Sequence, residues 1–309
     1  MGANFSLQSA AMSRRIGLLA RLRRVLELGE RILADLAGSP PAAELFDRYW
    51  AFRWDVSRGP GRLVPIDKPH AFDLGDLIGV DLSVAGLTAN TEQFLAGYPS
   101  NHVLLFGERG TGKSSAVKGL LTRYGQRGLR MVEVHKSDLV HLPAVLDSLR
   151  GASYRFVLFC DDLSFDSGES EYRELKAALE GSLVAPPENV RIVVTSNRRN
   201  LLPESAADNR LVRLDEDGEV QLAEAIDEKL ALSDRFGLVL GFYGFDQTTY
   251  LNIVDHYAKK AGVRTSHGEL HESALRWALR RSSRSGRIAR QFVDDLVGRE
   301  AIAEPPTRS

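Results

Sequence analysis

Short apolar runs alternate along the chain with longer stretches in which apolar residues recur at helical spacing. Four of these runs are typical of buried parallel strands, because each is short and apolar; they cover residues 103–106, 129–134, 156–160 and 190–195. The intervening stretches have the pattern of helices and cover residues 115–124, 137–149 and 171–183. Strands that alternate with helices predict right-handed crossovers and a three-layer α/β sandwich around a parallel sheet.

The two ends of the chain have a different pattern. From residue 246 to residue 297 the apolar spacing is purely helical, which predicts a separate small helical domain. Residues 13–36 also have helical spacing, with six arginines between the apolar positions. A packed amphipathic helix, a membrane-surface helix and a partner-binding arm all fit this stretch; Glu27, Glu30 and Asp35 dilute the basic face and favour the packed helix.

Five aromatic residues follow that first helical stretch. Core packing is the expected role of this cluster, and a stacking platform for nucleic-acid bases is the alternative; its members are Phe46, Tyr49, Trp50, Phe52 and Trp54.

A glycine-rich loop lies between the first predicted strand of the sheet and the helix after it. Residues 107–114 have the spacing G-x-x-x-x-G-K-[ST] of a phosphate-binding loop. Glycines allow backbone N–H groups to surround phosphate oxygens, and the N-terminus of the helix adds partial positive charge. We expect Lys113 to reach the β- and γ-phosphates and the Ser114 hydroxyl to bind Mg²⁺. The sequence therefore predicts binding of a nucleoside triphosphate.

Polar side chains follow two other predicted strands. Asp161 and Asp162 come directly after the run 156–160, and Asn197 follows the run 190–195. Ligands of such sheets lie beyond the carboxyl ends of the strands, so these groups are expected to face the phosphates. Asp161 then suits Mg²⁺, Asp162 suits the attacking water, and Asn197 suits sensing of the terminal phosphate. Each could instead only form a turn.

Composition narrows the class of protein. The 309 residues are 43% hydrophobic and 26% charged, which is ordinary for a soluble globular protein. A net charge of −1 gives no global electrostatic case for nucleic acid or an anionic membrane. The single cysteine, Cys160, excludes an internal disulfide and fits a cytoplasmic protein. No apolar run approaches the roughly 20 residues that span a bilayer, and no secretory signal is evident.

Histidines and arginines complete the candidate chemistry. The 7 histidines show neither an HExxH motif nor Cys/His ligand spacing, so the sequence predicts no zinc site. Arg235 adjoins Asp234 and fits either a surface ion pair or a stabiliser of phosphoryl charge supplied by a neighbouring subunit. The six arginines within 276–290 could face phosphates, contact nucleic acid or form a solvated surface.

With these elements in order, the chain resembles the AAA+ ATPases. Residues 76–81 resemble the segment that lines the adenine pocket, which implies roles for Ile78 and Gly79. Residues 156–162 are similar to Walker B, Asn197 to sensor 1, and residues 286–291, with Arg287, to sensor 2. Arg235 lies in a stretch similar to the arginine-finger box. Walker A and the residue after it would supply the nucleotide contacts Gly107, Glu108, Arg109, Gly110, Thr111, Gly112, Lys113, Ser114 and Ser115.

A narrower resemblance rests on three short segments of the sequence. RFVLFCDDLSF at 155–165, TSNRR at 195–199 and KLALSDRFG at 229–237 resemble a bacterial AAA+-type family of predicted ATP-binding proteins that is catalogued as a domain of unknown function. The likeness spans about residues 45–297. It implies a helical N-terminal extension at 1–73, an α/β nucleotide-binding domain at 74–245, a helical lid at 246–299 and an unstructured tail at 300–309.

The resemblance also implies an activity. ATP and Mg²⁺ would be bound, the γ-phosphate hydrolysed, and the sites completed between subunits of a homo-oligomer with Arg235 in trans. The client would be a macromolecule, either protein or nucleic acid. One departure matters: most AAA+ motors have Asp-Glu at the end of Walker B, and Asp162 is one methylene shorter than that glutamate. Either the water lies closer, with a possible contribution from Asp166 or Glu169, or the protein is a nucleotide-gated switch with little turnover.

Overall fold

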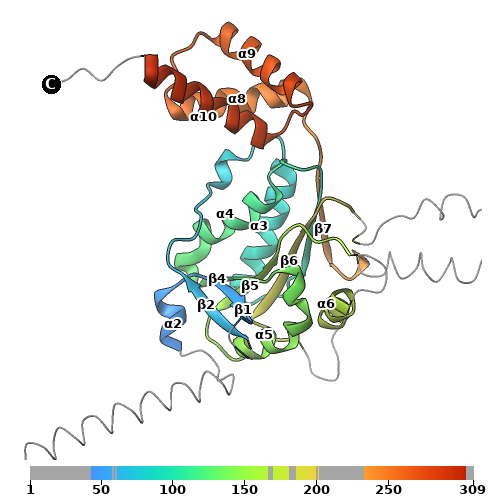
Figure 1. The fold of residues 1–309 in the computed structure, drawn as a ribbon. Helices are drawn as coiled ribbons and strands as arrows, with labels where there is room; N and C mark the ends of the chain where they lie inside the picture. The colour runs from blue at the N-terminus through green and yellow to red at the C-terminus, as the bar shows by residue number, and fades with distance from the viewer. Residues whose placement is uncertain are drawn as a thin grey trace, which may run out of the picture.

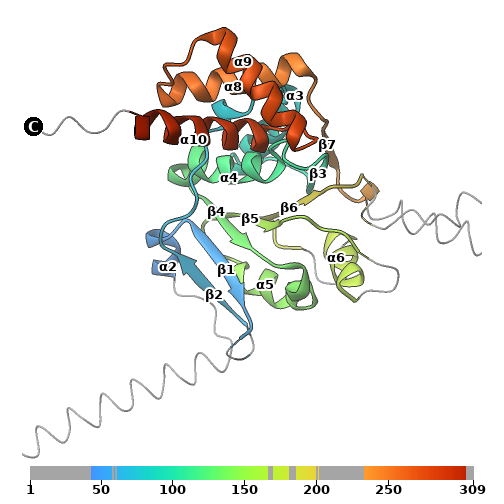
Figure 2. The same ribbon diagram turned by 45° about the horizontal axis from the view of Figure 1, so that its top comes forward.

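The computed structural model describes residues 43–303, except 58, 60, 166–169, 181–185, 200, 202–232 and the side chain of Glu180. An α/β body forms the larger part of the molecule, and a bundle of helices lies over one end of its sheet (Figures 1 and 2). The helix predicted at 13–36 and the residues Asp166 and Glu169 lie outside the described residues.

The body is built on a seven-stranded sheet with the order β2-β1-β4-β5-β6-β3-β7. Neighbouring strands are parallel, apart from the antiparallel pair β1–β2 at one edge. Because β6 lies between β3 and β5, the segments that follow these three strands emerge side by side at the carboxyl edge of the sheet. The strands are Ala51–Asp55 (β1), Arg62–Ile66 (β2), Val103–Gly107 (β3), Leu129–Glu133 (β4), Arg155–Cys160 (β5), Val190–Ser196 (β6) and Leu238–Phe242 (β7).

Helices cover both faces of this sheet. The first core contains Phe156, Leu158 and Cys160 of β5 and packs against α2 (Ala43–Arg48), α5 (Leu142–Leu149) and α6 (Ser170–Glu180). The opposite core contains Val157 and Phe159 and packs against α3 (Asp81–Leu95) and α4 (Lys113–Tyr124). Alternate residues of one strand thus serve opposite cores, which explains why the run 156–160 is apolar throughout. The predicted three-layer P-loop fold with a parallel sheet is confirmed.

The remaining helices form a bundle with a core of its own. They are α8 (Gln247–Ala261), α9 (His267–Arg280) and α10 (Gly286–Ala303), and they bury Tyr250, Phe292 and other apolar residues between them. The Asp246 carboxylate caps the start of α8 by accepting a hydrogen bond of 2.7 Å from the Thr249 backbone N–H. We call this bundle the lid. No helix in the described part of the chain has the length and apolar character needed to cross a membrane.

Two local predictions were wrong, and one strand was missed. Residues 51–66, placed in a helical extension, form β1 and β2; Phe52 and Trp54 are buried, and β1 adds to the sheet beside β4. The strand β7 was not predicted at all. Residues 300–303, placed in a tail, continue α10, because the Glu300 carboxylate accepts hydrogen bonds from Thr265, including one of 2.6 Å from its hydroxyl.

The stretch predicted as one helix at 137–149 is divided. It begins as a 3₁₀ helix, Lys136–His141 (η3), and continues as α5 with a proline in its first turn. A short 3₁₀ turn, Gly125–Arg127 (η2), follows the C-terminal end of α4. Within the aromatic cluster, Phe46, Phe52 and Trp54 are at most 3% exposed, in agreement with core packing.

Candidate functional site

A cleft of about 650 Å³ lies where the carboxyl edge of the sheet meets the lid. Its floor is the segment from Arg109 to Ser115, together with Asp161, Asp162, Thr195 and Asn197. Its lid wall includes Ile253, Tyr257, Arg287 and Arg290. Segments from six separate parts of the sequence therefore meet in this one place.

The phosphate-binding loop has the backbone conformation that its glycines permit. Gly107, Gly110 and Gly112 have φ angles of 136°, 78° and 104°, a region that side chains disfavour. A Cβ atom on Gly107 would lie 1.9 Å from the carbonyl oxygen of Phe242 in β7. Gly112 forms the N-terminal boundary of α4, so the first free N–H groups of that helix are directed into the cleft.

Lys113 is the first residue of α4, and its ammonium group is held within the loop. It donates hydrogen bonds of 2.7 Å to the carbonyl oxygens of both Gly107 and Glu108. Burial lowers the pKa of Lys113, and the charges of Arg287 and Arg109 act in the same direction, against the opposing effect of Asp162 and Asp161. The cleft therefore holds a buried cation with four charged neighbours.

Asp161 and Ser114 are brought together as predicted. The Ser114 hydroxyl donates a hydrogen bond of 2.6 Å to Asp161 Oδ1, and the Thr195 hydroxyl donates one of 2.5 Å to the same oxygen. Thr195 Oγ1 also accepts a hydrogen bond of 2.8 Å from the backbone N–H of Asp162. Thr195 was missed in the sequence, although its place at the end of a strand beside Asn197 is the kind of position where polar site residues occur.

Asn197 contacts both Lys113 and Asp162. Its amide nitrogen donates a short hydrogen bond to Asp162 Oδ1, and its amide oxygen accepts one of 3.2 Å from Lys113. Asp162 adopts a left-handed backbone conformation with φ of 52°. That conformation is uncommon for a residue with a side chain, and aspartate is one of the few types that tolerate it.

The lid contributes two arginines to the cleft. Arg287 and Arg290 both line it, and the backbone N–H of Arg287 donates a hydrogen bond of 3.3 Å to the Gly110 carbonyl oxygen. The predicted arginine cluster is thereby divided: Arg281 lies over the Trp277 ring at 4.2 Å, and Arg276 pairs with Glu272 one turn earlier.

Apolar groups also line the cleft. Phe72, Leu77 and Ile78 lie in the segment before α3. Phe245 lies just before α8, and Ile253 lies on α8. The predicted adenine-pocket residue Ile78 therefore lines the cleft, whereas Gly79 does not; a Cβ atom on Gly79 would lie 2.4 Å from the Thr249 methyl carbon at the start of α8. Gly107 and Glu108 also lie outside the lining, although their carbonyl oxygens hold Lys113.

An ion-pair network fastens the lid to the 3₁₀ turn η1 (Leu74–Asp76). Lys260 Nζ and His256 Nε2 of α8 lie 2.7 and 2.8 Å from Asp76 Oδ1. Burial alone raises the pKa of Asp76, but hydrogen bonds from Lys260 and His256 outweigh it and hold the pKa below its usual value. About 180 residues separate Asp76 from these partners, so no local pattern could have indicated this contact.

One predicted catalytic residue does not line the cleft. Arg235 precedes β7 and is half-buried, and it is not among the residues that line the cleft of its own chain. All the other predicted catalytic residues, Lys113, Asp162, Asn197 and Arg287, do line it.

The comparisons with known proteins give a family. The model of a family described as "Protein of unknown function (DUF815)" matches residues 47–300, which confirms the resemblance to a bacterial family of unknown function. No curated protein matches the chain. Among solved structures, the Thermotoga maritima RuvB Holliday junction branch migration motor is 18% identical, with 75% of this chain and 71% of that chain covered and a TM-score of 0.49. A proline-to-glycine mutant of the same motor is 20% identical, with coverage of 75% and 72% and a TM-score of 0.48.

Proposed function

We propose that this chain, which belongs to the family described as Protein of unknown function (DUF815), binds ATP with Mg²⁺ and hydrolyses its γ-phosphate. The observation that carries the proposal is the arrangement around Lys113. The loop that holds this lysine lies against Asp161, Asp162 and Asn197, and two arginines of the lid line the same cleft.

The polar and apolar parts of the lining suit the two parts of ATP. Backbone N–H groups of the loop and the N-terminus of α4 favour phosphate oxygens, and Lys113, Arg287 and Arg290 add positive charge. The apolar lining residues, which include Leu77, Ile78 and Phe245, suit a purine ring. The nucleotide would therefore contact body and lid together.

The oxygen atoms beside the loop fit Mg²⁺. Ser114 Oγ and Asp161 Oδ1 are 2.6 Å apart, and hydroxyl and carboxylate oxygens are ligands that Mg²⁺ accepts. When bound, the ion would neutralise charge on the phosphate oxygens. Thr195 would orient the Asp161 carboxylate from behind through its own hydrogen bond.

Asp162 is the candidate to orient the attacking water and accept its proton. Asn197 donates a hydrogen bond to the Asp162 carboxylate and also contacts Lys113. It would therefore link the lysine that contacts the phosphates to the candidate base. Arg235 would act from a second copy of the chain, since it does not line the cleft of its own. The active form would then be a homo-oligomer with shared sites that acts on a macromolecular client, either protein or nucleic acid.

A second candidate function is a nucleotide-gated switch with little turnover. The side chain of Asp162 is one methylene shorter than glutamate, and its Oδ1 already accepts a hydrogen bond from Asn197. A carboxylate engaged in this way is less available to a water molecule. In this case ATP would change the position of the lid without being consumed.

The test is phosphate release by the purified protein with Mg-ATP over a range of protein concentrations, beside nucleotide binding measured with a fluorescent ATP analogue. Lys113→Ala should lose binding and release, whereas Lys118→Ala, on the same helix outside the cleft, should keep both. A rate per chain that rises with protein concentration supports shared sites. Binding without release at any concentration supports the switch, and absence of nucleotide binding by the unaltered protein would overturn both.

A further inference from the structure

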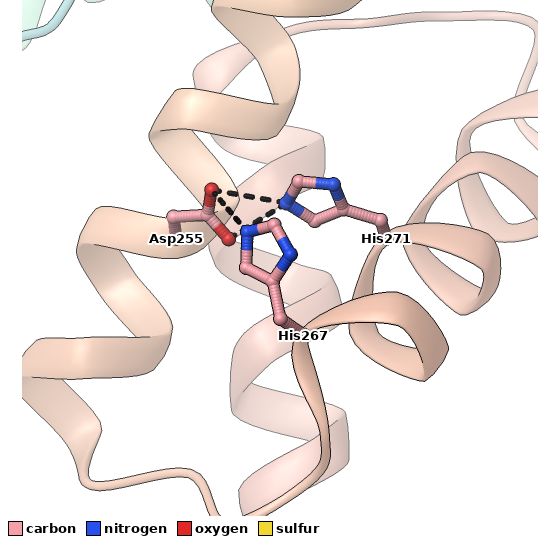
Figure 3. Close-up of side chains that lie close together, drawn as sticks. All are labelled: Asp255, His267 and His271. Carbon is pink, nitrogen blue, oxygen red and sulfur yellow. Dashed lines mark hydrogen bonds and ion pairs between the residues drawn. The ribbon is translucent and has the colours of Figure 1, made fainter.

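Two histidines and an aspartate converge on the outer side of the lid, apart from the cleft. His267 and His271 lie one turn apart on α9, and Asp255 lies on the neighbouring helix α8 (Figure 3). Residues four positions apart on a helix lie on the same face, so both imidazole rings are presented to α8. Their ring centroids are 4.0 Å apart.

All three side chains direct their ligand atoms to one point. His271 Nε2 lies 2.8 Å from Asp255 Oδ1, and His267 Nε2 lies 3.4 Å from Asp255 Oδ2. The three ligand atoms all lie within 4.8 Å of one another. In a tetrahedral zinc centre, with metal–ligand bonds of about 2.0–2.1 Å, neighbouring ligand atoms are about 3.3 Å apart. The observed separations bracket that value, so an ion could enter with small side-chain movements.

The chemistry of the three ligands selects the class of ion. Mg²⁺ and Ca²⁺ prefer oxygen ligands, whereas two imidazole nitrogens and one carboxylate suit a divalent transition metal such as Zn²⁺. The His267 side chain is 74% exposed, which gives an ion a direct path from solvent. A fourth coordination position would be left for water or an outside group.

We propose that Asp255, His267 and His271 form a Zn²⁺-binding site that joins α8 to α9 in the lid. This proposal departs from the expectation, based on the absence of HExxH and Cys/His ligand spacing, that the histidines form no zinc site. His267 and His271 have the H-x₃-H spacing of a helical metal pair, and the third ligand comes from a different helix.

The site has a structural consequence within the lid. Asp255 lies on α8 between Ile253 and Tyr257, which both line the cleft. A bound ion would fix this helix to α9 through three coordination bonds in place of hydrogen bonds. We therefore expect Zn²⁺ to raise the melting temperature of the full chain, since a ligand that binds only the folded form stabilises it.

The test uses the full chain after removal of metal with a chelator, in a buffer with excess Mg²⁺ to occupy oxygen-ligand sites such as Ser114 and Asp161. Zn²⁺ binding is measured by calorimetry, and Co²⁺ is used as a visible-absorption probe of coordination by nitrogen and oxygen. The variants are His267→Gln and the double variant His267→Gln/His271→Gln. His135→Gln is the matched control, because that histidine is exposed and lies on the body.

We expect one Zn²⁺ per chain and a higher melting temperature for the unaltered protein and for His135→Gln. Loss of His267 should weaken binding at least about tenfold, since even residues behind the ligands typically contribute that much, and the double variant should show no thermal effect of Zn²⁺. Because His267 is largely exposed, its replacement leaves the packing of the lid intact. Absence of Zn²⁺ binding by the unaltered protein, or equal affinity in the double variant, would overturn the proposal.

Discussion

The backbone N–H of Arg287 donates a hydrogen bond of 3.3 Å to the carbonyl oxygen of Gly110. The first turn of α10 therefore rests directly on the phosphate-binding loop. A Cβ atom added to Gly110 would lie 2.7 Å from Ser285 Oγ and 3.3 Å from the Arg287 Cβ atom, so the two segments approach closely only because residue 110 has no side chain.

Gly110→Ala should separate the lid from the loop and weaken nucleotide binding at least tenfold. The added methyl group meets Ser285, and the φ angle of 78° adds about 1–2 kcal/mol of backbone strain. Fluorescence titration with an ATP analogue measures the effect. Gly151→Ala is the control for strain alone, because its φ angle is 76° and no atom lies within 4 Å of the added Cβ. Equal binding by the two variants would mean that the contact between lid and loop has no role in holding nucleotide.

Asp162→Ala should retain nucleotide binding and reduce phosphate release by about 100-fold or more, which is the usual contribution of a general base. Asp162→Glu extends the carboxylate by one methylene and should keep or increase the rate. Single-turnover phosphate release measures both. If Asp162→Ala released phosphate at the unaltered rate, Asp162 would not be the base.

Thr195→Val should destabilise the body and weaken the response to Mg²⁺. The hydroxyl donates to Asp161 and accepts from the Asp162 N–H, and its loss leaves a backbone N–H without this partner. We expect a loss of about 1–3 kcal/mol in the free energy of unfolding, measured by urea denaturation, and a higher Mg²⁺ requirement for ATP binding. Thr88→Val is the control, since that hydroxyl bonds only to carbonyl oxygens of its own helix. Similar losses in the two variants would contradict a special role for Thr195.

Asp76→Asn should lower the free energy of unfolding by about 1 kcal/mol near neutral pH, because the hydrogen-bonded charge pair with the half-exposed Lys260 is lost. The pKa of Asp76 is lowered in the folded protein, so its contribution is complete above the ordinary pKa of 3.8 and disappears as pH falls through the folded value. Urea denaturation of both proteins at decreasing pH should show the difference shrink only below about pH 4. A difference that stayed constant into that acid range would show that the charge of Asp76 is not responsible.

Local sequence patterns were sufficient to predict part of the fold and part of the candidate site. The loop spacing at 107–114 and the apolar runs 103–106, 129–134, 156–160 and 190–195 correctly placed four strands and the floor of the cleft. Each of these patterns lies within a few neighbouring residues. The apolar runs are easy to recognise because strands buried on both faces of the sheet are apolar throughout.

The features that were missed depend on partners far away in the sequence. In the sequence alone, β1 is indistinguishable from the rest of the aromatic cluster, and only its pairing with β4 defines it as a strand. The strand β7 is a run of only five residues that includes a glycine. Arg130 lies inside β4 and is 4% exposed, and it is accommodated because carbonyl oxygens of Phe46, Gly125 and Leu129 accept its hydrogen bonds. The group of Asp255, His267 and His271 likewise forms only when α8 and α9 pack together.

Phe245 packs against two cores at once, that of α3 and α4 beneath the sheet and that of the lid. Ile78, from the segment before α3, also packs against the lid core. The contact between the two cores depends on a few groups, including the Phe245 ring, the Asp76 pair with Lys260 and the bond from Arg287 to Gly110. Separation of the lid from the body at these contacts should cost far less free energy than global unfolding, because both cores keep their packing. Amide hydrogens at the contacts between lid and body should therefore exchange with solvent much faster than those in β5. A molecule bound in the cleft would slow exchange at these contacts without affecting exchange in β5.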